Sequence, residues 1–221
     1  MKTLLRFTLL IALVAGPLLL WQAAFELAVQ RDVEELALPD DAPEAAARRA
    51  AAVERLDELG DEALPAVIAT FGVTEGPLQR GVTIQRSGLA ADAGPLVNPA
   101  MGWLRGRPGP ATVDALIDAL DDANLDVRHF AGLTLAWIGT PAVPALVDTL
   151  RTGAPGQRAA AAFALSFMGA EGVPAVPALQ EALHHPDKDV HYTARYAIQQ
   201  LSPGNEGFWE AVEAARRSPS R

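Results

Sequence analysis

The residues best suited to chemistry lie near the end of the chain, where three of the four histidines gather in the segment HHPDKDVH. His184, His185 and His191 stand there beside two aspartates, and imidazole with carboxylate is a ligand set for zinc or iron-like ions. The same segment has the pattern of a turn, because Pro followed by Asp-x-Asp ends one helix and caps the next. A metal site and an ordinary turn are both open interpretations, and the pattern favours the turn.

A second set of candidate residues is acidic and recurs in three similar segments, LIDAL, LVDTL and LQEAL. A fourth carboxylate lies four residues before the first of them, and hence on the same face of a helix. The set is Asp114, Asp118, Asp148 and Glu181. Such a column would attract a positively charged protein or peptide and speed its association. The alternative is the solvated polar face that any amphipathic helix carries.

A third set is cationic and stands 11 residues before Gly60, Gly139, Gly169 and Ser202. It consists of Arg49, Arg128, Arg158 and His191. We expect these side chains to form a structural ladder that hydrogen-bonds the carbonyls and aspartates of the turns between units. An anion-binding site is the alternative interpretation.

A repeated pair of helices between residues 126 and 201 positions these side chains. Each unit has an Ala-rich amphipathic helix ending at or near Gly, a turn with Pro, and a second apolar helix ending in Leu. Gly139, Gly169 and Ser202 hold the same place in successive units, 30 and 33 residues apart. Two helices per unit at this period predict an all-α fold, an α-solenoid of stacked antiparallel helix pairs. The predicted helices are 111–120, 126–138, 142–150, 157–168, 173–183, 189–201 and 207–216.

The repeat also resembles a known family. The pattern D-x-V-R-x-x-A-A-x-A-L-x-x-[IL]-G, followed by x-P-A-V-P-x-L-x-x-x-L, is carried by residues 127–150 and 157–183, with a third copy starting at 190. It resembles HEAT repeats, most closely the PBS lyase-type HEAT-like repeats, over residues 109–216 and less closely over 44–72. The resemblance implies that second helices line a concave surface. In that family most repeats are protein-binding scaffolds, and a minority act on bilins or bind metal.

The N-terminal stretch has the features of a membrane anchor. Residues 7–25 are uncharged, and a helix of that length covers the roughly 30 Å hydrocarbon core of a bilayer. Lys2 and Arg6 precede the run, so the positive-inside bias puts the N-terminus in the cytoplasm and the rest outside. A cleaved signal peptide is the alternative. It fits less well because neither Ala23 nor Ala24 ends a small-x-small cleavage motif. A buried globular helix is the third interpretation.

These patterns together predict a division of the chain. We expect a signal anchor at 1–30, an acidic linker at 31–43, a solenoid at 44–216 and a disordered tail at 217–221. Within the solenoid, a first helical hairpin covers 44–59 and 63–71. The segment 73–110 is irregular, with short helices near 78–91 and 96–104, and is either a binding insertion or a diverged repeat.

Composition excludes several classes of function. The net charge of −9 argues against a nucleic-acid-binding surface, and the absence of cysteine excludes thiol nucleophiles, thiolate metal sites and disulfides. No phosphate-binding loop, nucleophile elbow or zincin motif occurs. The sequence therefore favours a membrane-anchored, non-enzymatic scaffold that has no cofactor. This scaffold would bind a protein or peptide on the exported side. The alternatives are an exported metal-binding or lyase-like enzyme, and a spacer recognised only through 73–110.

Overall fold

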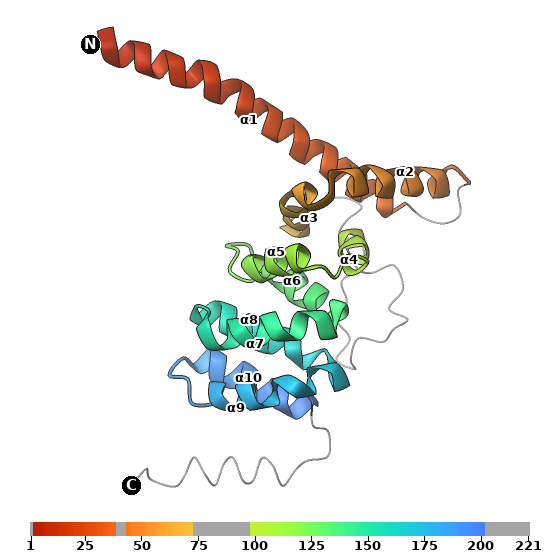
Figure 1. Ribbon diagram of the computed structural model, residues 1–221, viewed down its shortest axis with the longest axis vertical. Helices are drawn as coiled ribbons and strands as arrows, with labels where there is room; N and C mark the ends of the chain where they lie inside the picture. Colours follow the sequence, from red (N-terminus) through yellow and green to blue (C-terminus); the bar gives the residue numbers. More distant parts are fainter. Residues whose placement is uncertain (1, 39–42, 73–97, 202–221) are drawn as a thin grey trace. The chain divides into compact units, whose positions relative to one another are not determined.

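The computed structural model describes residues 2–38, 43–72 and 98–201, with side chains from residue 19 onward (Figure 1). Every regular element within these ranges is a helix. The chain divides into two compact units, and among the described residues the boundary falls between Trp103 and Leu104. The range 44–216 that was predicted for the solenoid includes residues of both units.

The first unit is built from α1 (Lys2–Leu36), α2 (Pro43–Leu59) and α3 (Leu64–Ala69). Short 3-10 turns follow α2 at Gly60–Ala63 and α3 at Thr70–Gly72. Gly60 has a φ of 56°, a left-handed conformation that glycine adopts without steric cost, so it ends α2 as its position predicts. The predicted first hairpin is thus confirmed. Both of its helices also contact α1.

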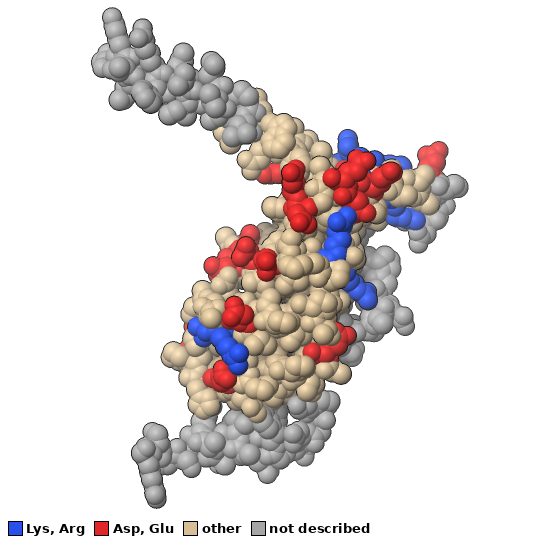
Figure 2. Space-filling view, in the orientation of Figure 1, with Lys and Arg blue, Asp and Glu red and all other residues tan. Residues whose placement is uncertain are grey.

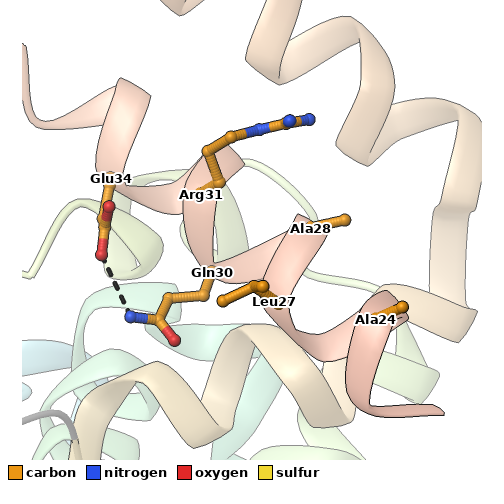
Figure 3. A pocket seen from close by; sticks show the side chains of 6 residues that line it. All are labelled: Ala24, Leu27, Ala28, Gln30, Arg31 and Glu34. Carbon is orange, nitrogen blue, oxygen red and sulfur yellow. Dashed lines mark hydrogen bonds between the residues drawn. The ribbon is translucent and has the colours of Figure 1, made fainter. Parts of the chain in front are cut away.

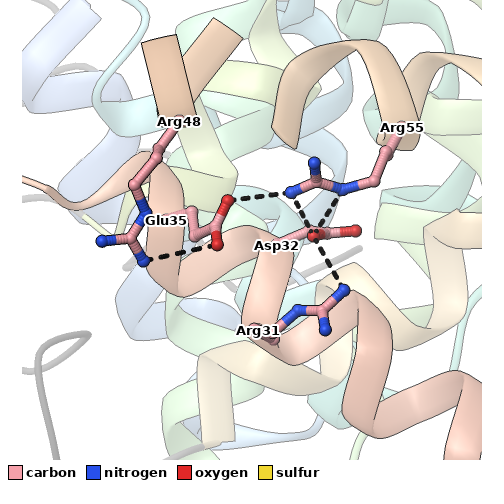
Figure 4. A network of polar contacts seen from close by, with 5 residues as sticks. All are labelled: Arg31, Asp32, Glu35, Arg48 and Arg55. Carbon is pink, nitrogen blue, oxygen red and sulfur yellow. Dashed lines mark hydrogen bonds and ion pairs between the residues drawn. The ribbon is translucent and has the colours of Figure 1, made fainter. Parts of the chain in front are cut away.

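The last two turns of α1 pack on α2, and this overturns part of the predicted linker. Val29 and Val33 are fully buried, and Asp32 between them is only 4% exposed. Arg55 of α2 donates to Asp32 Oδ1 from Nε at 2.9 Å and from Nη2 at 2.7 Å (Figure 4). Arg55 Nη2 also lies 2.8 Å from Glu35 Oε2. Residues 31–36 are therefore helical, with Asp32 and Glu35 paired with Arg55, and the linker prediction is wrong for these six residues.

The charged groups of this network shift one another's pKa values. Burial by itself would raise the pKa of Glu35, but hydrogen bonds from Arg55 and Arg48 outweigh it and lower that pKa. The hydrogen bond to Asp32 raises the pKa of Arg55, against the opposing effect of burial. Asp32 is nearly inaccessible to water, so the close pair with Arg55, together with the longer 3.8 Å contact to Arg31, offsets its lost hydration.

The helix α4 (Pro99–Arg105) lies within the segment predicted to be irregular. Its residues up to Trp103 belong to the first unit, where Trp103 Nε1 donates to Asp57 Oδ1 at 2.9 Å. Asn98 Oδ1 accepts from the Ala100 backbone N–H at 3.0 Å and so caps the helix start. The helix predicted near 96–104 is confirmed, whereas the one near 78–91 lies outside the described residues.

The second unit consists of two layers of helices (Figure 1). One layer contains the first helices of each repeat, α6 (Leu125–Ile138), α8 (Pro155–Ser166) and α10 (Lys188–Leu201). The other contains the second helices, α5 (Pro110–Ala119), α7 (Val143–Thr152) and α9 (Val176–Ala182). Neighbours within each layer touch, and α7 packs on α8 as α9 does on α10. This arrangement confirms the predicted all-α solenoid over these residues. The predicted helix at 207–216 and tail at 217–221 lie outside the described residues.

The core of this unit repeats with the sequence. In the first helices, one buried column of small residues and one of large residues run through α6, α8 and α10. All six side chains have zero exposure: Ala131, Ala161 and Ala194, then Leu135, Leu165 and Ile198. In the second helices, Leu116, Leu146 and Leu179 are likewise fully buried. Because each such leucine contributes about 1.5–3 kcal/mol only when a neighbouring repeat covers it, the stacked units stabilise one another.

Within the part of the chain whose side chains are described, no single helix combines the length and apolarity needed to cross a membrane. The segments Leu125–Ile138 and Thr140–Thr152 meet that condition only as a pair, bent by 116°. Most of the predicted span, residues 7–18, lies outside the described side chains. The transmembrane helix stays a prediction.

Candidate functional site

The predicted acidic residues lie on the exposed side of the second helices. Asp114 and Asp118 are exposed on α5, Asp148 on α7 and Glu181 on α9. Since α5 contacts α7 and α7 contacts α9, the carboxylates follow one another from repeat to repeat. We call the exposed sides of these three helices the second-helix face. Figure 2 shows acidic side chains spread over the visible side of the second unit, with basic ones beside them.

One member of the column is paired, and the sequence analysis missed its partner. Glu181 accepts from Arg151 of α7, with Oε2 3.2 Å from Nε and Oε1 3.4 Å from Nη2. Both side chains are at least half exposed, so the pair is worth at most about 1 kcal/mol. The two residues are 30 positions apart, one repeat period, which is the signal that could have revealed the pair.

The other carboxylates of the column differ from Glu181. Asp114, Asp118 and Asp148 make no side-chain hydrogen bond or ion pair with another described residue. Their side chains are exposed to water. The second-helix face thus offers three uncompensated carboxylates on two adjacent helices.

The predicted ladder residues bond main-chain carbonyls that precede their own helices. Arg128 Nη1 donates to the Asp122 carbonyl at 2.6 Å, and Arg158 Nε donates to the Gly153 carbonyl at 2.7 Å. His191 Nδ1 lies 2.6 Å from the Leu183 carbonyl, and Arg49 Nη1 donates to the carbonyl of Leu38 in the first unit. Each side chain therefore holds the incoming turn against the helix that follows it, which is a structural role.

The structure does not bring the three clustered histidines together as a metal centre. The His185 Nδ1 atom accepts from the Asp187 backbone N–H at 3.1 Å, while His191 Nδ1 must donate to its carbonyl. Asp187 Oδ1 accepts from the backbone N–H of Asp189 at 2.8 Å and starts α10. No group of three His, Asp or Glu side chains among the described residues is arranged to hold a metal ion. These contacts support the turn interpretation of HHPDKDVH, and no grouping of the described residues supports the metal interpretation of His184, His185 and His191.

His129 is a titratable residue that the sequence analysis did not single out. Its ring lies 5.4 Å from that of Phe163 and 6.1 Å from that of Phe130, between centroids. The Nε2 atom is buried and has no hydrogen-bond partner among the described residues. Burial lowers the pKa of His129, against a smaller opposite effect of Asp126. Nothing in its sequence context separates it from an exposed helical histidine.

A hollow of about 400 Å³ lies along α1 (Figure 3). Its lining residues all come from one helix, and Gln30 Nε2 donates to Glu34 Oε1 at 3.0 Å there. A hollow walled by a single helix lacks the converging groups of a binding site.

The comparisons with known proteins agree with the architecture. A family model of HEAT repeats matches residues 99–166 and 113–202, which together extend from α4 to the end of α10. Comparison with curated proteins gives no match. The α1–α3 segment lies outside the matched range, and the PBS lyase-type subtype stays a prediction. Residues 99–202 of this chain thus match the HEAT-repeat family, as the resemblance in the sequence predicted.

Proposed function

We propose that this protein is a membrane-anchored HEAT-repeat scaffold, without catalytic activity of its own, that binds a positively charged segment of another protein on the exported side. The observation that carries the proposal is the set of uncompensated carboxylates on the second-helix face. Asp114, Asp118 and Asp148 stand exposed on two adjacent helices, and no described cation neutralises them.

The repeat architecture supports a binding role because it provides an extended and rigid surface. Stacked helix pairs form an extended surface whose side chains are held at fixed spacing by a shared core. A row of like charges on such a surface raises the local potential, so it speeds the encounter with a cationic partner and disfavours an anionic one. The charges are exposed, so their contribution falls as salt concentration rises.

Charge reversal on the second-helix face tests the binding proposal. We would compare the full chain with the double variant Asp118→Lys and Asp148→Lys as bait in pull-downs from solubilised membranes of the native cell. The matched control is Glu54→Lys with Glu58→Lys, two exposed positions on α2 in the first unit. Both double variants change the net charge by the same amount.

The outcome depends on where the partner binds. If the proposal holds, the α5–α7 variant loses partners that wild type and the α2 control both retain, and the loss is greatest at low salt. Retention of the same partners by all three baits would refute the second-helix face as the binding surface. Loss by both variants would reveal only a response to net charge, which also contradicts the proposal.

The anchor part of the proposal draws on α1. The described turns before the contact with α2 expose large apolar side chains, with Leu19, Leu20, Trp21 and Leu27 each 64–74% exposed. A lipid environment would cover such a group of side chains. The helix also continues without a break past Ala23 and Ala24, whereas signal peptide cleavage there would cut inside a helix.

Cell fractionation with protease accessibility tests the anchor. We expect the full-length chain to stay in the membrane and to be digested only from the exported side. A soluble chain shortened by about 24 residues would show that the leader is a cleaved signal peptide, and the scaffold would then act free in the exported space.

A further inference from the structure

A second site emerges at the edge of the repeats, where an open cleft of about 490 Å³ lies between α7, α8, α9 and the turn after α9. This volume is within the range of small-ligand sites. Its apolar lining includes Leu150 and Ala178, which are 2% and 3% exposed, together with Ala182. The polar lining consists of Arg151, Arg158, Glu181, His184 and His185.

Three of the side chains that line this cleft carry hydrogen-bond donors. Arg158 uses Nε for the Gly153 carbonyl, so both of its terminal nitrogens keep their hydrogens for another acceptor. Arg151 uses Nε and Nη2 for Glu181, which leaves Nη1. His185 accepts a hydrogen bond at Nδ1 and therefore carries its proton on Nε2 when neutral. Each of these three side chains keeps at least one donor without an acceptor among the described residues.

The charge of the cleft is opposite to that of the chain. Glu181 is its one carboxylate and pairs with Arg151, so the charge of Arg158 is left without a counter-ion among the described residues. The chain as a whole carries a net charge of −9. A guanidinium with two unused terminal nitrogens fits the two oxygens of a carboxylate or phosphate in a bidentate manner.

We propose that this cleft binds an oxoanion, a carboxylate or phosphate group, with Arg158 as the principal ligand and with Arg151 and His185 as additional donors. The apolar floor receives the small apolar part of the molecule that carries the anion. The site is distinct from the uncompensated carboxylates of the second-helix face, so its failure would leave the proposed function untouched.

Titration calorimetry on the full chain, in a neutral detergent at low ionic strength, tests this proposal. The two probes are inorganic phosphate and an acetylated, amidated tripeptide with a central glutamate, which distinguish a phosphate source from a peptide carboxylate. Arg158→Gln should weaken binding about tenfold or more, because a charge-assisted bidentate contact is lost. Glu181→Gln should tighten binding about fivefold, because it removes the competing carboxylate and frees the Arg151 donors.

The control is Glu62→Gln, an exposed glutamate of the first unit with the same change of charge, which should bind as wild type does. Saturable binding of either probe with both expected shifts supports the site and identifies the source. No binding of either probe, or equal affinity in wild type and Glu181→Gln, would overturn it. If the Arg158→Gln chain does not fold, Glu181→Gln decides the question by itself.

Discussion

Replacement of Gly139 by alanine is the most informative perturbation of the repeat, because two independent features require glycine there. Gly139 ends α6 with φ 75° and ψ −138°, a conformation that costs a residue with a side chain about 1–3 kcal/mol. A Cβ atom at this position would also lie 2.1 Å from Glu171 Oε2. That oxygen accepts from the Thr140 backbone N–H at 2.6 Å and from the Thr140 hydroxyl at 3.0 Å.

The magnitude follows from these two terms. Moving the Glu171 carboxylate away breaks both bonds to Thr140, and since the groups are exposed we assign this loss about 0.5–1 kcal/mol. Gly139→Ala should therefore lower the free energy of unfolding by roughly 1.5–4 kcal/mol. Glu171→Ala alone should lower the free energy of unfolding only by the value of the lost bonds to Thr140. Gly139→Ala, when added to Glu171→Ala, should lower it further only by the cost of the backbone conformation.

Denaturant unfolding followed by circular dichroism measures all three variants, and hydrogen exchange of the Thr140 amide reports the broken bond. The matched control is Gly156→Ala in α8, where an added Cβ meets no atom within 4 Å and stability should change by less than about 1 kcal/mol. If Gly139→Ala is as mild as Gly156→Ala, the argument from backbone conformation is wrong. Equal costs of Gly139→Ala with and without Glu171 would refute the steric part.

The remaining predictions concern charges in the two units. Arg55→Ala should destabilise the contact of α1 with α2 by about 1–3 kcal/mol, because buried Asp32 then keeps only a longer contact to Arg31, at 3.8 Å. Faster hydrogen exchange in α1 and α2 alone would support this, and unchanged exchange would contradict it. Because the pKa of Glu35 is lowered in the folded chain, its contribution to folding stability is present above the ordinary pKa of 4.5 and is lost as the pH falls below that value. In Glu35→Gln this part of the pH dependence of stability should be absent. The lowered pKa of His129 means that the unfolded chain binds its proton more tightly, so stability should fall by up to about 1.4 kcal/mol per pH unit as the pH drops below 6.5. His129→Phe should abolish that dependence, and an unchanged pH profile of unfolding would show that His129 is not its source.

The repeat could be predicted from the sequence because its signals are local and periodic. Gly139 and Gly169 mark helix ends, and their positive φ values agree with that reading. The alanine and leucine columns follow from spacings of 30 and 33 residues, because equivalent positions in stacked repeats meet the same neighbours. The turn character of HHPDKDVH likewise depends on residues close in sequence.

Contacts between side chains far apart in the sequence could not be predicted in the same way, because the pairing of two charged side chains depends on which helices pack together. The acidic residues after position 30 have the composition of a solvated linker, yet Asp32 and Glu35 meet Arg55 once α1 lies on α2. Sequence patterns likewise cannot tell that Asp118 and Asp148 have no ion pair with another described residue, or that Arg158 lines a cleft. The sequence by itself determined the helices and their repeat, through local propensity and periodic burial. Only the tertiary structure decided which charges are compensated, because that depends on distances of a few ångströms between helices.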